Sequence, residues 1–418
     1  GMLAPGATRT LCWRGLETAE PGRYSFAAPS PLSFVAFNAE PREIAATVAT
    51  KWSRVQITSD DGVGIYGIAE TWNGGAWQRV GSLYPLASVE IMDAEDNVRA
   101  LDLHLSKCDA ASDRHVSLTL NAVNPDGGAW SVNLELEATH EAARIRCDAA
   151  LNAPAGVRLV SFYGPQVLAG DRAFGAEKEF AVFPGVEYLA RDEESSSERD
   201  LAPPLNDRRV VAIHKVAAPI MAVQGKDALI GLVWNANQEW AEGHRHPAAR
   251  FLAPKPGMGV DHIHMSLFAP SVGKYVRENT YGAYESPFPI DAATTLRIES
   301  HLVLDHASRY APDSVVHGPH AGGLVLQTVQ HWFDIFGFPE PSAPPREWAA
   351  ERALCRYAYA HGVWSDDPPG WRHCHGWEPG LYVSQALPQM LDIRAGVSDE
   401  VRADVEGRIK RVFDRALE

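Results

Sequence analysis

The chain has 418 residues, which suits two to three domains of about 150 residues each. Acidic residues (53) outnumber basic ones (38). The net charge of −15 argues against a nucleic-acid binder and a polybasic membrane-surface protein, because both need a positive field. Ordinary shares of hydrophobic (45%) and charged (22%) residues exclude global disorder. The five cysteines lack CxxC spacing, which argues against a disulfide scaffold or a zinc ribbon.

The start of the chain carries no recognisable targeting signal. Gly1-Met2 resembles the remnant of a tag, and residues 3–20 lack an apolar run behind basic residues, so we predict no signal peptide. No stretch approaches the roughly 20 consecutive apolar residues of a membrane span. We therefore expect a cytoplasmic protein without a membrane segment, although a trimmed start would leave secretion open.

From about residue 20 to 310 the hydrophobic pattern has a period of two, which predicts strands. Residues 53–58 and 63–68 alternate on either side of Asp60-Asp61-Gly62, which has the composition of a turn. Residues 116–123 and 130–137 flank Asn124-Pro-Asp-Gly-Gly and predict a second hairpin. Residues 219–223 and 228–234 predict a third, and residues 297–304 a late strand. A dozen or more strands without helical crossovers indicate antiparallel sheets stacked as a large sandwich.

Near residue 312 the period changes to 3.6, which predicts helices. The first apolar stripe consists of Leu324, Val325, Val329, Trp332, Phe333 and Phe336. A proline-rich connector follows, then helices over 346–360 and 381–394, and a last helix capped by Ser398. We expect a β domain over residues 1–311 and a small helical region over residues 312–418.

This order of elements resembles the galactose-mutarotase-like supersandwich followed by an (α/α) toroid, as in several glycoside hydrolase and polysaccharide lyase families. The resemblance concerns the order of elements along the whole chain, and no family motif aligns with it. It implies a mainly β protein with a large antiparallel two-sheet supersandwich, an oligo- or polysaccharide as partner, and no cofactor. A complete toroid has about twelve helices where this chain supplies about four, so the helical region would be a partial toroid and its cleft incomplete.

The densest group of aromatic and titratable residues lies in the loop between the second and third predicted helices. Tryptophan faces stack on sugar rings, and glycoside hydrolysis needs two carboxyl groups across the scissile bond. Glu378 is the candidate general acid, because Trp377 and Pro379 would desolvate it and raise its pKa, with Asp366 or Asp367 as partner base. The other candidates in this loop are His375 for catalysis and Trp364, Trp371, Arg372, His373 and Trp377 for substrate binding. The ordinary alternative is that the tryptophans anchor the loop and the histidines form routine hydrogen bonds.

Two further segments suggest a sugar groove. In residues 183–200 an aromatic and mixed charges interrupt the β pattern, and Glu187, Tyr188 and Arg191 could line a cleft. The alternative is a solvated loop with local ion pairs. Around Trp234, Glu239 and Trp240 the sequence mixes aromatic and polar residues, as carbohydrate grooves do.

Two short patterns remain ambiguous. His244 with His246, and His262 with His264, have the spacing that places two imidazoles on one face of a strand, but the motif is too short to predict a metal site, and we expect none. Trp72 and Trp77 flank an Asn-Gly-Gly turn, where they either display their rings or close the end of the sandwich.

The leading hypothesis is a carbohydrate-active protein, most similar to a glycoside hydrolase, with carboxylate chemistry in a tryptophan-lined cleft. One alternative is a non-catalytic carbohydrate-binding or scaffold protein of the same architecture. The other is a polysaccharide lyase using His375 or Tyr382 as the base, which the negative net charge disfavours. Motifs for nucleotide hydrolysis, α/β-hydrolase chemistry and dinucleotide binding are missing from the sequence.

Overall fold

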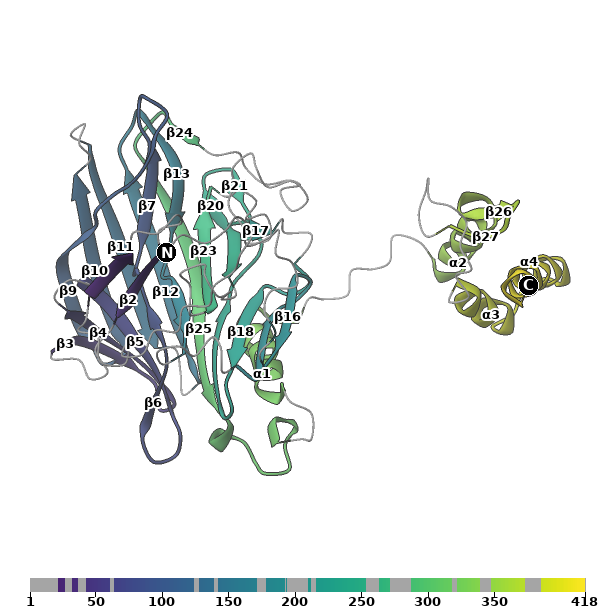
Figure 1. The fold of residues 1–418 in the computed structure, drawn as a ribbon, viewed down its shortest axis with the longest axis horizontal. Helices are drawn as coiled ribbons and strands as arrows, with labels where there is room; N and C mark the ends of the chain where they lie inside the picture. Colours follow the sequence, from purple (N-terminus) through teal and green to yellow (C-terminus); the bar gives the residue numbers. More distant parts are fainter. Residues whose placement is uncertain are drawn as a thin grey trace, which may run out of the picture. The chain divides into compact units, whose positions relative to one another are not determined.

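The computed structural model describes fifteen stretches of the chain: residues 22–26, 32–36, 43–60, 64–123, 128–138, 142–170, 178–191, 193, 210–211, 216–252, 263–270, 287–317, 322–338, 347–372 and 385–417. The chain divides into two compact units, Gly1–Gly337 and Phe338–Glu418. Unit 1 is built from two large antiparallel sheets and unit 2 mainly from helices (Figure 1).

The first sheet of unit 1 has twelve strands. Its main path runs β3 (Ile44–Ala49), β4 (Ser53–Asp60), β5 (Gly64–Trp72), β6 (Trp77–Leu83), β14 (Val167–Ala169), β23 (Ile263–Ala269), β13 (Val157–Tyr163), β7 (Ser88–Met92) and β8 (Val98–Ala100). Three further strands join it from the side: β17 (Val210–Val211), β22 (Ala248–Leu252) and β24 (Phe288–Ile290).

The second sheet has nine strands. Its order is β16 (Glu187–Ala190), β15 (Phe180–Phe183), β18 (Ile220–Gln224), β19 (Ala228–Val233), β25 (Thr294–His306), β12 (Arg144–Ala153), β11 (Ala129–Ala138), β10 (His115–Val123) and β9 (His104–Ser112). The described part of unit 1 also has two short pairs: β1 (Gly22–Phe26) with β2 (Leu32–Ala36), and β20 (Glu239–Ala241) with β21 (His244–Arg245).

The main core of unit 1 contains inward-facing residues from both sheets. In β11 every second residue is buried, beginning with Trp130 and ending with Ala138, while the residues between them are partly exposed. Such alternation buries one face of a strand and leaves the other at the surface. The nine-stranded sheet therefore presents a polar outer face, and this face carries the candidate site.

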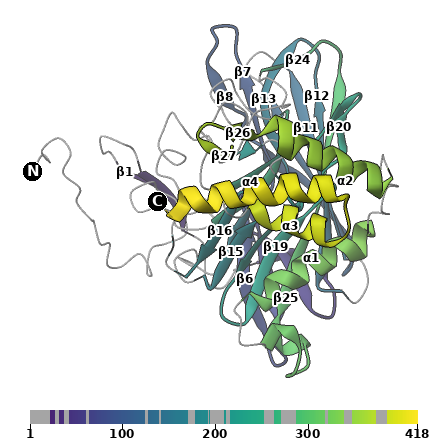
Figure 2. The same cartoon turned by 90° about the vertical axis from the view of Figure 1, so that its right-hand side faces the viewer.

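Helix α1 (Gly323–Phe336) covers one part of that outer face, in front of β19 and β25 (Figure 2). Leu324 and Val325 are buried in a second apolar cluster with Leu229 and Val303 of the sheet. Close approach is allowed by Gly231, because a Cβ there would lie 3.1 Å from Cγ2 of Thr328 on the helix. The short 3₁₀ helices η6 (Ala307–Arg309) and η7 (Val315–His317) connect β25 to α1.

Unit 2 contains α2 (Trp348–Tyr357), the π-helical turn η8 (Ala358–Gly362), the hairpin β26 (Trp364–Asp366) and β27 (Pro369–Trp371), α3 (Ala386–Arg394) and α4 (Asp399–Leu417). Its buried apolar cluster consists of Trp371, Ala386 and Val412. The hydroxyl of Ser398 accepts a hydrogen bond from Val401 N at 3.3 Å, which confirms the predicted cap of the last helix.

The structure confirms the mainly β, antiparallel two-sheet class and the strands of the three predicted hairpins. Helix α1 packs on the sandwich, and the compact units divide after Gly337. The domains expected over residues 1–311 and 312–418 stay a prediction. Closure of the few helices of unit 2 into part of a toroid stays a prediction. Among the helices that the structure describes, none has the length and apolar character needed to cross a membrane.

Candidate functional site

The loop that the sequence analysis favoured is only partly described. Residues 373–384, which include His373, His375, Trp377, Glu378 and Tyr382, lie outside the described residues. Trp364, Asp366, Asp367, Trp371 and Arg372 are described and lie in or beside the β26–β27 hairpin.

Trp371 is a core residue of unit 2. Its side chain is 0% exposed and its ring meets that of Trp364 edge-on at 5.0 Å. Trp371 therefore packs in the core of unit 2, and the sugar contact proposed for it from the sequence stays a prediction.

Trp364 and Asp366 have partners within unit 2. Nε1 of Trp364 donates to Oδ1 of Asp366 at 2.9 Å, and Arg411 of α4 pairs with the same oxygen at 2.7 Å. The guanidinium groups of Arg408 and Arg411 lie 5.2 and 5.4 Å from the Trp364 ring centroid. The hydrogen bonds from Trp364 and Arg411 lower the pKa of Asp366, so this carboxyl is ionised and paired; Asp366 and Asp367 are both exposed.

The predicted cleft residues of the second segment do not converge. Glu187 and Tyr188 are neighbours on β16 and point to opposite faces of the sheet, Glu187 buried and Tyr188 62% exposed. Arg191 has a left-handed backbone with φ of 48°, and its carbonyl accepts a hydrogen bond from Nζ of Lys178 at 2.7 Å. These three residues therefore do not line one surface.

The third predicted group consists of two enclosed tryptophan rings and one surface carboxylate. Trp234 is 1% exposed and packs edge-on against Phe183, and Trp240 is 0% exposed and stacks on His244 at 5.1 Å. Both rings are interior. Glu239 lies at the surface, 3.5 Å from Nε of Arg245.

Of the two histidine pairs, the described members His244, His246 and His264 do not gather into a metal-ligand set. The His244 ring lies between Trp240 and Phe288, and Nδ1 of His246 is 2.8 Å from the carbonyl oxygen of Ala236. His264 lies on β23, and His262 falls outside the described residues. Within the described stretches no three His, Cys, Asp or Glu side chains gather where a metal could bind.

Trp72 and Trp77 face each other across the end of the β5–β6 hairpin. Their rings meet edge-on at 5.4 Å, and the Arg54 guanidinium lies 4.6 Å from the centroid of Trp77. This cross-strand pair stabilises the hairpin end, as aromatic pairs commonly do.

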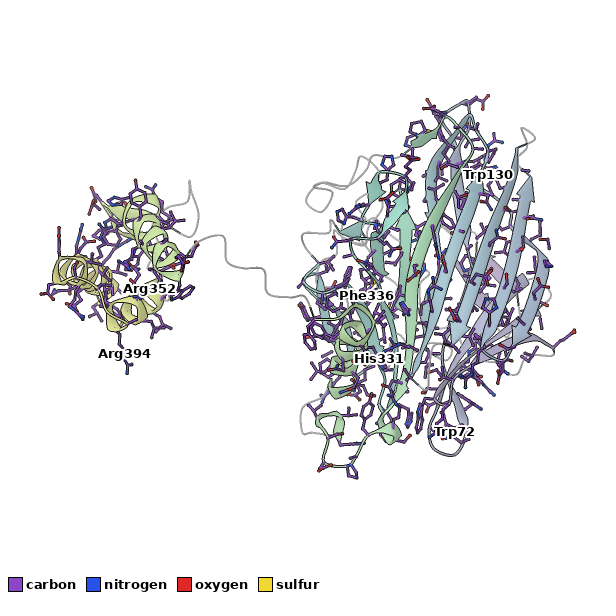
Figure 3. The ribbon with its side chains drawn as sticks, turned by 180° about the vertical axis from the view of Figure 1, so that it is seen from behind. Trp72, Trp130, His331, Phe336, Arg352 and Arg394 are labelled. Carbon is purple, nitrogen blue, oxygen red and sulfur yellow. The ribbon has the colours of Figure 1, made fainter. Side chains whose placement is uncertain are left out.

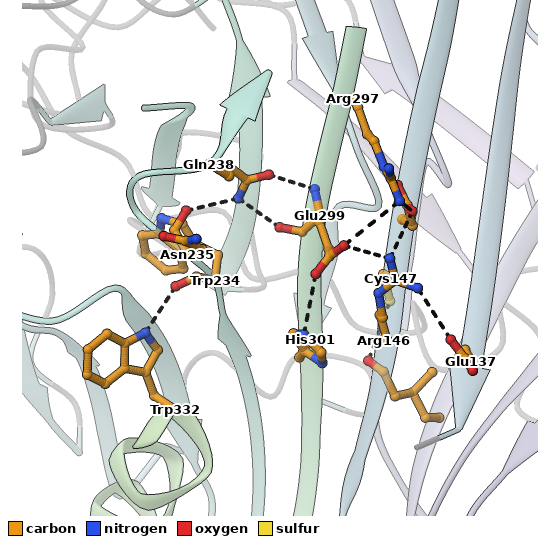
Figure 4. A network of polar contacts seen from close by, with 12 residues as sticks. Glu137, Arg146, Cys147, Trp234, Asn235, Gln238, Arg297, Glu299, His301 and Trp332 are labelled. Atoms are coloured by element: carbon orange, nitrogen blue, oxygen red, sulfur yellow. Dashed lines mark hydrogen bonds and ion pairs between the residues drawn. The ribbon is translucent and has the colours of Figure 1, made fainter. Parts of the chain in front are cut away.

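The structure gathers a different set of polar side chains on the outer face of the nine-stranded sheet. We call it the Glu299 cluster, and it consists of Glu137, Arg146, Asp148, Gln238, Arg297, Glu299 and His301 (Figure 4). Three neighbouring strands supply most of it: Glu137 pairs with Arg146 across β11 and β12, and Asp148 with Glu299 across β12 and β25. Residues two apart in a strand share a face, which places Arg297, Glu299 and His301 side by side.

Arg146 occupies the centre of the cluster. One of its terminal nitrogens, Nη2, lies 2.6 Å from Oε2 of Glu299 and 3.1 Å from Oδ2 of Asp148, and Nη1 lies 3.3 Å from Oε2 of Glu137. Arg297 pairs with both oxygens of Asp148. Hydrogen bonding to Glu299 raises the pKa of Arg146, and hydrogen bonding to Asp148 raises that of Arg297, so both guanidinium groups stay charged.

Gln238 fixes the backbone of β25 within the cluster. Its side-chain oxygen accepts from the Glu299 amide at 2.8 Å, and its side-chain nitrogen donates to the Glu299 carbonyl at 2.9 Å. The pairing of β19 with β25 reaches no further than His301. The carboxamide therefore satisfies backbone groups of Glu299 where the neighbouring strand ends.

Helix α1 forms one border of the cluster. Phe336 meets the His301 ring edge-on at 5.9 Å, and Nε1 of Trp332 donates to the carbonyl of Trp234 at 3.1 Å. Figure 3 shows Phe336 and His331 of this helix against the sheet. Burial lowers the pKa of His301 to about 4, so its ring is neutral at pH 7.

Sequence reasoning missed this cluster although a signal was present. Arg297, Glu299 and His301 alternate with apolar or small residues in the predicted late strand, and Arg146 and Asp148 do the same in β12. The pattern shows that each strand has a charged face. It does not show that β12 and β25 are neighbours.

Comparisons with known proteins found solved structures of low similarity. Neither the scan against family models nor the search of curated proteins found a match. Among solved structures, an α-N-acetylgalactosaminidase from Bifidobacterium bifidum is 8% identical with a TM-score of 0.41, covering 84% of this chain and 50% of that one. A GH36 α-galactosidase from Geobacillus stearothermophilus is 11% identical with a TM-score of 0.36, covering 62% and 39%.

A galactose mutarotase related enzyme from Lactobacillus acidophilus is 10% identical with a TM-score of 0.35, covering 62% of this chain and 97% of that one. This chain thus spans about half the length of the first structure, the Bifidobacterium bifidum enzyme. Unit 1 has the supersandwich architecture that the order of elements predicts.

Proposed function

We propose that this is a carbohydrate-active protein that binds an oligo- or polysaccharide over the outer face of the nine-stranded sheet, at the Glu299 cluster. The observation that carries the proposal is the alternation of carboxylates and guanidinium groups at the surface of three adjacent strands. Arg297 is 56%, Glu137 46% and Glu299 35% exposed, so these charged groups are within reach of a ligand.

The chemistry of these groups suits sugar hydroxyls. A hydroxyl both donates and accepts, so carboxylate acceptors beside guanidinium donors bind neighbouring hydroxyls on one ring. The face continues with neutral polar residues: Thr295 donates to Asn152 at 2.8 Å, and Asn152 donates to Ser131 at 3.0 Å. A saccharide longer than one unit would therefore find polar partners along the strands.

The competing explanation is an ion-pair network that only supports the fold. Exposed pairs contribute about 0–1 kcal/mol each, so a network of this kind at the surface adds little stability. Substitution of Glu299 separates the two explanations, because a purely structural network predicts unchanged glycan binding and a binding site predicts weaker glycan binding.

Cleavage of glycosidic bonds is a separate proposal for unit 2 and comes from the sequence of the 364–380 loop. Glu378 would be the general acid. Asp367 is the better partner base, because Asp366 is held by Arg411 and Trp364. Binding without cleavage, and lyase chemistry on a uronate, are the alternative outcomes.

The test compares four proteins on a glycan array and in a reducing-sugar assay: wild type, Glu299→Gln, Glu378→Gln, and Glu95→Gln as an exposed carboxylate control in the β7–β8 turn. We expect Glu299→Gln to weaken binding about tenfold or more, the usual effect of losing a hydrogen bond to a charged group. Glu378→Gln should keep binding and abolish cleavage. Unchanged glycan binding by Glu299→Gln would contradict a site on this face.

A further inference from the structure

His301 is the one member of the Glu299 cluster whose polar atoms are not accounted for by the fold. Its side chain is 7% exposed, and its buried Nδ1 has no hydrogen-bond partner among the described residues. Nε2 faces Oε1 of Glu299 at 3.8 Å. Nδ1 and Nε2 lie on different edges of the imidazole ring, so the ligand atom inferred below is placed by Nε2 and by Oε1 of Glu299, and not by Nδ1.

The distance between Nε2 of His301 and Oε1 of Glu299 determines what can lie between them. At 3.8 Å it exceeds the usual hydrogen-bond length of about 2.7–3.2 Å, so Nε2 and Oε1 do not bond to each other directly. If an oxygen atom lay about 2.8 Å from both Nε2 and Oε1, the Nε2–O–Oε1 angle at that atom would be about 85°. This angle is compatible with two hydrogen bonds to one hydroxyl group. The other oxygen of Glu299 is bound by Arg146 at 2.6 Å, and Gln238 holds the Glu299 backbone, so the carboxylate is already oriented.

The charge state restricts what fits between the two side chains. Burial is the main cause that lowers the pKa of His301; Glu299 and Glu137 raise it, Arg144 and Arg146 lower it, and the resulting pKa is about 4. A neutral imidazole carries one N–H. That proton is best placed on Nε2, next to the Glu299 carboxylate, which leaves Nδ1 as a bare acceptor. The space between the two side chains then offers one donor, Nε2–H of His301, and one acceptor, Oε1 of Glu299. A hydroxyl group can accept from the first and donate to the second.

We propose that Glu299 and His301 together bind a single hydroxyl group of the saccharide. Nε2–H of His301 donates to the hydroxyl oxygen, and the hydroxyl proton is donated to Oε1 of Glu299. This inference rests on the proposed function and specifies the ligand. A sugar with a hydroxyl group that reaches both Nε2 and Oε1 is bound, and a sugar that lacks this hydroxyl binds more weakly. A carboxylate in the same place is repelled by Glu299. His301 is thus a specificity-determining residue.

The first experiment follows the histidine side chains of ¹⁵N-labelled protein by NMR while D-galactose, D-glucose or D-mannose is added at neutral pH. We expect the free protein to show a neutral His301 with the proton on Nε2, and at least one of the three sugars to shift this resonance. The His115 resonance, assigned through His115→Gln, is the control, because His115 lies on the same sheet face but pairs with Glu135 at 2.8 Å. A His301 resonance that none of the sugars moves would overturn the inference.

The second experiment measures the dissociation constant of the sugar that binds best. His301→Phe keeps the ring and loses both nitrogens, and we expect about a tenfold loss of affinity, which His301→Gln partly restores by returning an N–H near the Nε2 position. Binding by wild type should stay constant from pH 8 to about pH 5, because the His301 ring remains neutral over this range. Affinity that rises as the pH falls through 6.5 would instead require a charged imidazole and refute the assignment.

These results separate the inference from the proposed function. If Glu299→Gln weakens binding and His301→Phe does not, the saccharide site stands and the role of His301 is wrong. If wild type binds none of the three sugars and no glycan on the array, both are wrong.

Discussion

Asp305 is the most completely enclosed charged residue of unit 1 that the structure describes, with a side chain 0% exposed. Its Oδ2 lies 2.8 Å from Nη1 of Arg309 and 3.6 Å from Nε2 of His331, and it accepts a hydrogen bond from the Tyr310 hydroxyl. The interaction with His331 links the end of β25 to α1. Burial by itself raises the pKa of Asp305, but the contacts with His331, Arg309 and Tyr310 outweigh burial and leave the pKa lowered.

We predict that Asp305→Ala lowers the free energy of unfolding by about 3–5 kcal/mol at pH 7, as expected for breaking a buried ion pair. A carboxyl whose pKa is lowered on folding stabilises the protein above its unfolded pKa of 3.8, and this contribution is lost as the pH falls through the folded value. The difference between wild type and variant should therefore shrink below about pH 4. Urea unfolding at several pH values checks this, with the exposed Asp313→Ala as control; equal stability of the two variants at pH 7 would contradict it.

At the scale of elements, the β26–β27 hairpin and α4 form the centre of unit 2. Trp371 packs with Val412 of α4, and arginines spaced along that helix hold the preceding segment. Nη1 of Arg408 donates to the Ala360 carbonyl at 2.7 Å, and Nη1 of Arg415 to the Pro369 carbonyl at 2.9 Å. The tryptophans that suggested a sugar site from sequence therefore serve, in this hairpin, to build a small core.

We predict that Trp371→Ala destabilises unit 2 by about 3–5 kcal/mol, the usual cost of truncating a buried tryptophan. Trp348→Ala is the matched control, because Trp348 on α2 is 73% exposed and should change stability by less than about 0.5 kcal/mol. Urea unfolding followed by circular dichroism at 222 nm, which reports mainly on the helices, measures both. A Trp371→Ala variant with unchanged unfolding but weakened glycan binding would restore the predicted sugar contact.

At the scale of the whole molecule, the net charge of −15 determines which saccharides approach readily. Uniform negative charge repels polyanions over distances comparable to the Debye length and leaves neutral chains unaffected. The same repulsion disfavours the lyase alternative, because a lyase acts on polyuronates, which are polyanions.

We predict that a neutral polysaccharide such as galactomannan retards the protein in affinity electrophoresis equally at low and high salt. Polygalacturonate should retard it little, and least at low salt where repulsion is strongest. Retardation by polygalacturonate that is greatest at low salt would indicate a local basic groove and favour the lyase alternative.

Much of the fold was predictable because its signals are local. The alternation in residues 116–123 and 130–137 and the turn between them predict a hairpin whatever the rest of the chain does. The candidate site was less predictable. Trp234, Trp240 and Trp371 stand among polar residues in the sequence, yet their large rings are buried, since a polar neighbour in the chain does not fix which way a side chain points.

The sequence by itself determined that this protein is mainly β, that its strands are antiparallel, and which face of each strand is apolar, because a period of two along a strand is a property of the strand alone. Only the tertiary structure decided that α1 packs on the sandwich and that β12 and β25 are neighbours, which brings together Asp148 and Arg297, 149 residues apart. Pairing between distant strands depends on backbone hydrogen bonds and packing that no local pattern encodes. The charged faces of single strands become one cluster only through that pairing.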